Sequence, residues 1–175
     1  MKTEEIQVLV MRVGGTNWDS ETKQVFEELG VYANILHFND VVKNRNILDY
    51  SAIVFPGGFS YGDYVRAGAI WATGIMTKLK KVLRNFVSEE RPIIGICNGF
   101  QVLVEAGLLP AFNGISKYPE ATLATNIPIG YRCKWIYLKH ENSGNCIFTR
   151  KIPESKIIPI PIAHGEGRFQ FLKEI

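Results

Sequence analysis

Runs of apolar residues in the first half of the chain alternate with segments in which apolar residues recur every three or four positions. The runs at 6–13, 31–38 and 51–55 are rich in Val, Ile, Leu and Phe, and they predict buried strands. The spaced segments at 19–29 and 68–87 predict amphipathic helices. Strands that alternate with helices predict an α/β fold, with a mostly parallel central sheet flanked by helices.

The pattern changes after Pro110, which follows the last helical segment. Residues 131–139, 145–148 and 157–162 predict strands with no helix between them, so their pairing is antiparallel or mixed. Pro159 interrupts the last of these runs and places it at a sheet edge or a strand end.

Residues 92–101, PIIGICNGFQ, predict a strand, a tight turn and a helix, with Cys97 in the turn. Gly95 and Gly99 allow the strand and helix to approach closely, as in a nucleophile elbow. The N-terminus of the following helix favours a thiolate. A buried structural cysteine is the ordinary interpretation of Cys in an apolar run, but these glycines and the polar Asn98 favour a nucleophile.

A nucleophilic thiol in this position suits acyl transfer, which requires two N–H donors for the oxyanion. The backbone of Asn98 offers one donor, and the turn at Gly57 and Gly58 offers the other. The loop at 57–64 is rich in glycine and aromatic residues and follows a strand, where ligands bind in open α/β sheets. The alternative is a flexible turn with packed aromatic side chains.

A general base for Cys97 would ordinarily be a histidine oriented by a carboxylate. His37 and His140 lie at a strand end and in a polar turn, where an incidental role is the simpler interpretation. His164 and Glu166 stand two residues apart in a glycine-flanked segment, so both side chains would face the same way in an extended chain. Spacing alone therefore leaves this pair open as base and orienting carboxylate.

Composition limits the remaining classes of function. The 175 residues predict one domain over 1–175, and a net charge of +3 gives no reason to expect a nucleic-acid partner. The basic run at 78–84 is interpreted as a solvated helix face. Three cysteines, no apolar leader and no membrane-length apolar run predict a cytoplasmic protein, and no motif spacing suggests a metal site.

Several long motifs resemble one known family, the class I (triad) glutamine amidotransferases. Within it, the chain resembles the glutaminase subunits of phosphoribosylformylglycinamidine synthase in purine biosynthesis. The motifs are GICNGFQ at 95–101, PGGFSYGDY at 56–64, RAG at 66–68, AGLLP at 106–110 and AHGEG at 163–167. The resemblance runs from the first strand to the last residue.

The resemblance implies a flavodoxin-like amidotransferase fold and glutamine hydrolysis through a thioester on Cys97. It implies that Gly58 and Asn98 form the oxyanion hole, and that Gln101 and Phe59 bind glutamine. Tyr61, Asp63 and Arg66 belong to a family motif, in a loop that would shape the glutamine pocket or a partner interface.

The implied partners are an ATP-dependent synthetase subunit, which would receive the ammonia, and a small accessory subunit. ATP and Mg²⁺ are expected on the synthetase, and no cofactor is expected in this chain. No Gly-x-x-x-x-Gly-Lys sequence occurs here to bind a nucleotide phosphate.

Two departures from the family pattern qualify this interpretation. Trp18 stands where the family has cysteine. The family's triad histidine and glutamate come from a His-Pro-Glu segment further downstream, whereas His164 and Glu166 match a different motif of uncertain role. Either the chain is a fragment and the C-terminal part of the fold lies outside this sequence, or the chain has lost the base. Removal of a triad partner costs several powers of ten in turnover. A catalytically incompetent domain that scaffolds or regulates the synthetase is the alternative; a PfpI-type hydrolase is disfavoured because that family lacks the 58–64 loop.

Overall fold

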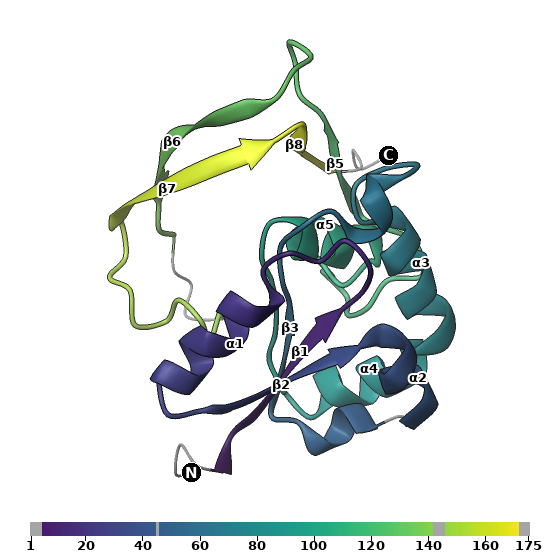
Figure 1. Ribbon diagram of the computed structural model, residues 1–175. Coiled ribbons are helices and arrows are strands. Elements are labelled where there is room, and N and C mark those ends of the chain that lie inside the picture. The colour runs from purple at the N-terminus through teal and green to yellow at the C-terminus, as the bar shows by residue number, and fades with distance from the viewer. Residues whose placement is uncertain (1–4, 45, 142–145, 172–175) are drawn as a thin grey trace. The chain divides into compact units, whose positions relative to one another are not determined.

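A computed structural model describes residues 5–44, 46–141 and 146–171 (Figure 1). The chain divides into two compact units. The first contains the described residues up to Thr122 together with Gln170 and Phe171, and the second contains Leu123–Phe169. The two units are described separately below.

A four-stranded parallel sheet forms the centre of the first unit. Its strands are β1 (Gln7–Arg12), β2 (Tyr32–His37), β3 (Ala52–Phe55) and β4 (Ile93–Gly95), in the order β2-β1-β3-β4. Both β1–β2 and β1–β3 pair in parallel, as does β3–β4. The predicted α/β class and parallel sheet are confirmed, and the order places the carboxyl ends of β3 and β4 side by side.

Five α-helices and two short 3₁₀ helices of the described residues belong to this unit. They are α1 (Asp19–Glu28), α2 (Phe38–Asn44), η2 (Asn46–Asp49), η3 (Ser60–Asp63), α3 (Ala69–Lys78), α4 (Lys80–Ser88) and α5 (Asn98–Glu105). The single helix predicted at 68–87 is wrong, because the chain breaks at Leu79, where φ is −116°. Leu79 is itself buried, and it shares one core with Leu83 and Phe86 of α4.

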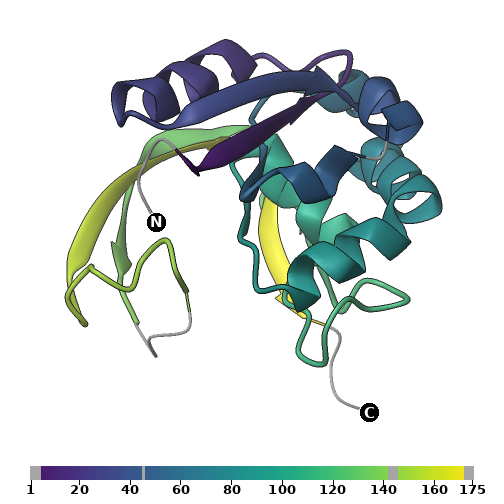
Figure 2. The ribbon, with the colours of Figure 1, turned by 90° about the horizontal axis from the view of Figure 1, so that it is seen from below.

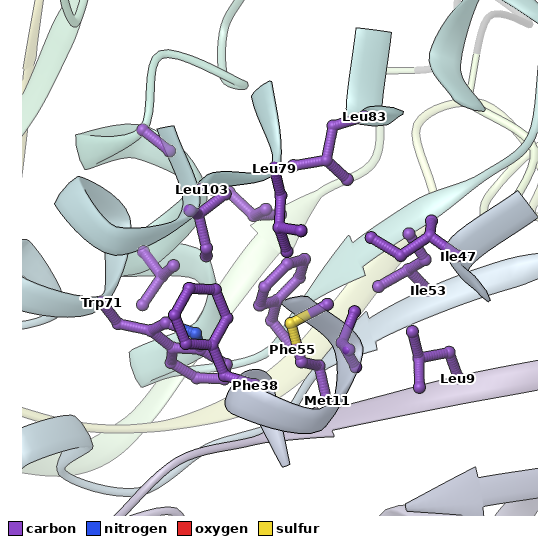
Figure 3. Close-up of a cluster of buried hydrophobic side chains, with 14 of the residues drawn as sticks. Leu9, Met11, Phe38, Ile47, Ile53, Phe55, Trp71, Leu79, Leu83 and Leu103 are labelled. Atoms are coloured by element: carbon purple, nitrogen blue, oxygen red, sulfur yellow. The ribbon is translucent and has the colours of Figure 1, made fainter. Parts of the chain in front are cut away.

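The alternation of side chains along β1 divides the core between the two faces of the sheet. Leu9 and Met11 pack with residues of α2, α3, α4 and α5. Figure 3 shows part of this cluster, including Phe55 and Trp71, whose ring centroids lie 5.3 Å apart. Val8 and Val10 point to the opposite face and share a smaller cluster with Phe26 of α1. Figures 1 and 2 show α1 on the side of β1 and β2 away from α3 and α4.

An antiparallel pair of strands lies in the second unit. β6 (Arg132–Lys139) pairs with β7 (Ile157–His164) over eight residue pairs. A separate two-stranded sheet pairs β5 (Ala121–Thr125) with β8 (Glu166–Phe171). β6 and β7 were predicted, whereas β5 and β8 were not. No helix in the described part of the chain is long and apolar enough to cross a membrane.

The strand predicted at 145–148 is wrong over its described residues. Residues 147–150 form a turn, while residue 145 lies outside the described residues. The N–H groups of Thr149 and Arg150 both donate to the carbonyl of Cys146, at 3.1 and 2.9 Å. Local hydrogen bonds therefore satisfy backbone groups that a strand would have paired with a neighbour.

Candidate active site

Cys97 occupies the junction between β4 and α5. β4 ends at Gly95, α5 begins at Asn98, and Cys97 has a φ of +53° and a ψ of −112°. A non-glycine residue held in such a conformation costs about 1–3 kcal/mol, and such strain is concentrated at functional sites. The thiol is exposed. The elbow expected from the sequence is thus present, with its cysteine accessible.

The two glycines that flank Cys97 are required by close contacts. A Cβ atom on Gly99 would lie 1.9 Å from the carbonyl oxygen of Phe55 in β3. A Cβ on Gly95 would lie 2.5 Å from the carbonyl oxygen of Gly99. Helix α5 can therefore start directly above the ends of β3 and β4 only because these positions carry no side chain.

The loop after β3 is held against the loop after β1. Thr16 and Gly58 form an isolated antiparallel bridge, in which Asn17 N–H donates to the Gly57 carbonyl at 3.1 Å and Phe59 N–H donates to the Gly15 carbonyl at 2.8 Å. Because the residues beside the bridged pair make these bonds, the N–H of Gly58 points away from the Gly15–Asn17 segment.

Two backbone N–H groups at the elbow are available to donate hydrogen bonds to a ligand. Within the described residues, neither Gly58 N–H nor Asn98 N–H donates a hydrogen bond. A Cβ on Gly57 would lie 3.4 Å from the Cβ of Cys97 and 3.2 Å from a ring carbon of Trp18. The β3 loop therefore lies directly against Cys97, and Trp18 borders the same space.

The side chain of Asn98 is the polar centre of the site, a role that the sequence did not reveal. Asn98 is 2% exposed. Its Oδ1 accepts the Ser60 N–H at 3.0 Å, and its Nδ2 donates to Asp63 Oδ1 at 2.9 Å and to Gln101 Oε1 at 3.0 Å. The structure thereby joins three residues of the predicted site, Asn98, Gln101 and Asp63, in one hydrogen-bond network.

Arg66 and Tyr61 fix the same loop further from Cys97. Arg66 pairs with Glu105 in the last turn of α5, whose side chain is only 6% exposed and also accepts the Thr122 hydroxyl at 3.3 Å. Tyr61 packs against the core, and burial raises the pKa of its phenol. The loop is therefore anchored at both ends of α5, by Asn98 and by Glu105.

An open pocket of about 380 Å³ adjoins the Arg66–Glu105 pair. Its other lining residues are Pro119, Ala121, Thr122, Gln170 and Phe171. Among the described residues, no group of three or more His, Cys, Asp or Glu side chains is placed to hold a metal ion.

His164 and Glu166 belong to the second unit, at the end of β7 and the start of β8. Asn126 donates through Nδ2 to the carbonyls of Gly130 and His164, so its Oδ1 accepts from His164 Nδ1 at 3.1 Å and that nitrogen carries the proton. A Cβ on Gly167 would lie 2.1 Å from the same nitrogen. Gly167 therefore makes room for the imidazole, and Asn126 fixes its orientation.

A model described as the CobB/CobQ-like glutamine amidotransferase domain matches residues 5–175. The chain belongs to this family. The amidotransferase match spans both units, which the sequence predicted as one domain.

Curated proteins of this family are similar to the chain over nearly its whole length. The chain is 42% identical to phosphoribosylformylglycinamidine synthase subunit PurQ of Archaeoglobus fulgidus, over 98% of this chain and 66% of that protein. It is 42% identical to the PurQ subunit of Methanococcus maripaludis strain C7, over 93% of this chain and 59% of that protein. The chain thus spans slightly less than two thirds of the length of these curated relatives.

Solved structures show the same fold. A structure of PurLQS from Thermotoga maritima matches with a TM-score of 0.77 and 32% identity, over 98% of this chain and 72% of that one. A Thermotoga maritima glutamine amidotransferase matches with a TM-score of 0.59 and 20% identity, over 97% of this chain and 64% of that one, which shows the fold alone.

Proposed function

We propose that this amidotransferase domain hydrolyses glutamine through Cys97, as the glutaminase part of phosphoribosylformylglycinamidine synthase. The observation that carries the proposal is the elbow itself: an exposed thiol on a strained residue, with the N–H groups of Gly58 and Asn98 beside it and without acceptors in the described structure. The PurQ names of the relatives support the choice of synthase.

The chemistry proceeds in two acyl transfers. The Cys97 sulfur attacks the side-chain carbonyl carbon of glutamine, and the N–H groups of Gly58 and Asn98 stabilise the oxyanion. The intermediate collapses to a thioester as the nitrogen takes a proton and leaves as ammonia. Water then attacks the thioester, which releases glutamate and regenerates the thiol. Gln101 and Phe59, on α5 and the β3 loop, are proposed to bind the substrate glutamine.

The proton transfers require a base that the elbow does not itself supply. His37 is the one histidine among the described residues of the first unit, and it ends β2, at the opposite edge of the sheet from β4. Its Nδ1 accepts the Asn39 N–H at 3.2 Å. We therefore assign no base within this unit, and we base the test of function on covalent capture of Cys97 rather than on turnover.

The ammonia is proposed to pass to an ATP-dependent synthetase subunit, with a small accessory subunit in the same assembly. The likeness to PurLQS from Thermotoga maritima supports this assembly. In this proposal ATP and Mg²⁺ bind to the synthetase, and the three free cysteines suit a cytoplasmic location.

A diazo-ketone analogue of glutamine tests the function directly. It should alkylate Cys97 with release of N₂, and peptide mass spectrometry should locate the adduct there. Cys133 and Cys146 are built-in controls, because both thiols are also exposed. Excess glutamine should protect Cys97 from the analogue, whereas iodoacetamide should modify all three cysteines.

Equal labelling of the three cysteines, or labelling that glutamine does not suppress, would refute a glutamine site at Cys97. Replacing Cys97 with Ser should abolish the adduct and leave iodoacetamide labelling of the other two cysteines unchanged.

A second candidate function is a non-catalytic module that scaffolds or regulates the synthetase. The absence of a histidine near the elbow within the described first unit favours it. Glutaminase turnover by the 175-residue chain that is lost in a Cys97→Ala variant would exclude this candidate.

A further inference from the structure

We propose that Asn98 is a positioning residue. Its side chain fixes the β3 loop, residues 57–66, against the elbow, and so keeps the N–H groups of Gly58 and Asn98 in place for the oxyanion. The inference rests on the proposed function. It concerns the side chain of Asn98, whereas the oxyanion role uses only its backbone N–H.

The orientation of the Asn98 amide is determined by its neighbours. Oδ1 faces an N–H donor on Ser60, and Nδ2 faces a carboxylate oxygen of Asp63. Exchanging the two atoms would set oxygen against carboxylate and NH₂ against N–H, so only the observed orientation makes both bonds. A hydrogen bond to an ionised carboxylate is about twice as strong as one between neutral groups.

The segment that Asn98 holds is under backbone strain. Tyr61, Asp63 and Val65 have φ values of 53°, 52° and 73°, although none of them is glycine. The side chain of Val65 is 93% exposed, so packing does little to hold the tip of the loop. Left-handed residues of this kind persist only where other contacts determine them.

Side-chain contacts from α5 compensate for this strain. Asn98 holds Ser60 and Asp63 from the first turn, and Glu105 pairs with Arg66 from the last turn. Of the two anchors, Asn98 is the one near the proposed oxyanion hole. It directly follows Cys97, and its partner Ser60 stands two residues after Gly58. Loss of the Asn98 contacts should therefore displace the Gly58 N–H relative to the thiol, whereas the thiol itself should stay accessible.

Exchanging the amide of Asn98 with the carboxylate of Asp63 tests this role. Asn98→Asp keeps the size of the side chain but places a carboxylate against Asp63, where like charges repel. We expect labelling of Cys97 by the diazo-ketone to slow by about ten- to a hundredfold relative to labelling by iodoacetamide. In the double variant Asn98→Asp with Asp63→Asn, the amide at position 63 donates to the carboxylate at position 98. The ratio of the diazo-ketone rate to the iodoacetamide rate should return most of the way to its wild-type value.

Asn34→Asp is the matched control. Asn34 lies on β2 in the same unit, and its amide also makes two side-chain hydrogen bonds, with Tyr50 and Tyr32. This variant should lose stability without changing the ratio of the two labelling rates. An unchanged ratio in Asn98→Asp would overturn the proposal, as would a failure of the exchanged pair to restore it. If Asn98→Asp does not fold, the double variant is compared with wild type. A ratio of labelling rates near the wild-type value supports the proposal, and a ratio lowered about tenfold or more overturns it.

Amide exchange at Ser60 provides a readout that does not depend on glutamine chemistry. The Ser60 N–H donates to Asn98 Oδ1, so its exchange with deuterium should accelerate in Asn98→Ala and remain unchanged in Asn34→Asp. If the wild-type chain resists the diazo-ketone, the proposed function fails while Ser60 exchange still tests Asn98. Equal Ser60 exchange in wild type and Asn98→Ala would refute the positioning role.

Discussion

At the residue scale, the three exposed thiols of the chain have different surroundings. Cys97 lies on the strained elbow, and Cys133 lies on β6. Cys146 begins a turn, where a hydrogen bond with the Thr149 side chain is the main cause that lowers the pKa of its thiol, assisted by backbone N–H groups of Phe148 and Thr149 and opposed by partial burial. These hydrogen bonds therefore favour the thiolate form of Cys146.

Replacing Thr149 with Val should raise the pKa of Cys146 toward the ordinary thiol value, because the hydroxyl that stabilises the thiolate is lost. A smaller thiolate fraction near pH 7 should slow iodoacetamide modification of Cys146 by roughly two- to fivefold. Since the folded-state pKa is depressed, the associated stabilisation is present above the ordinary thiol pKa and is lost as the pH falls through the folded-state value.

Peptide-resolved alkylation between about pH 6 and 10 measures this shift, with Cys133 as the internal control. An unchanged pH profile for Cys146 in the Thr149→Val variant would contradict the assignment of Thr149 as the main cause.

At the element scale, the approach of α5 to β3 determines the geometry of the elbow. Gly99→Ala would place a methyl group 1.9 Å from the Phe55 carbonyl oxygen, and backbone cannot yield as a flexible side chain can. A contact this short with the backbone places the cost of overpacking at the upper end of its usual range, about 3 kcal/mol. The better helix propensity of alanine offsets about 1 kcal/mol of that cost. We expect a net loss of about 2 kcal/mol in the free energy of unfolding.

Urea denaturation of wild type and variant measures this loss. Gly14→Ala is the matched control, because no heavy atom lies within 4 Å of the Cβ it would add. It should change stability by less than about 0.5 kcal/mol. Equal stability of the two variants would show that α5 can move away from β3 without cost.

The elements differ in how much of them the sequence could reveal. Hydrophobic runs predicted the four parallel strands, and paired glycines predicted the elbow, because both patterns are local. The break at Leu79 was hidden, because the helical spacing of apolar residues continues through it. β5 and β8 carry weak alternation and form by pairing with each other, which no local pattern encodes.

The site residues divide in the same way, into those that short motifs predict and those whose role depends on contacts between distant positions. Cys97, Gly58 and the backbone of Asn98 follow from motifs within short segments. The side chain of Asn98 could not be assigned, because its bonds to Ser60 and Asp63 join residues 38 and 35 positions away. The polar residue beside a nucleophile was a visible signal, but its partners became known only with the fold.

At the scale of the whole molecule, buried apolar residues are concentrated in one unit. The first unit contains both hydrophobic clusters, whereas Leu123 is the one buried hydrophobic residue among the described residues of the second unit. On β6, Trp135 and Tyr137 are both exposed. A two-stranded ribbon without a core of its own is marginally stable in water.

Hydrogen exchange should therefore separate the two units. Amides of β1 and β3 should exchange only on global unfolding, whereas those of β6 and β7 should exchange at least about a hundredfold faster through local opening. Phe55→Leu, which alters the first unit's core, should lower the protection of β1 and β3 while leaving β6 and β7 unchanged. Equal protection in all four strands, or a parallel loss in both units on Phe55→Leu, would instead show that the chain opens as one cooperative structure.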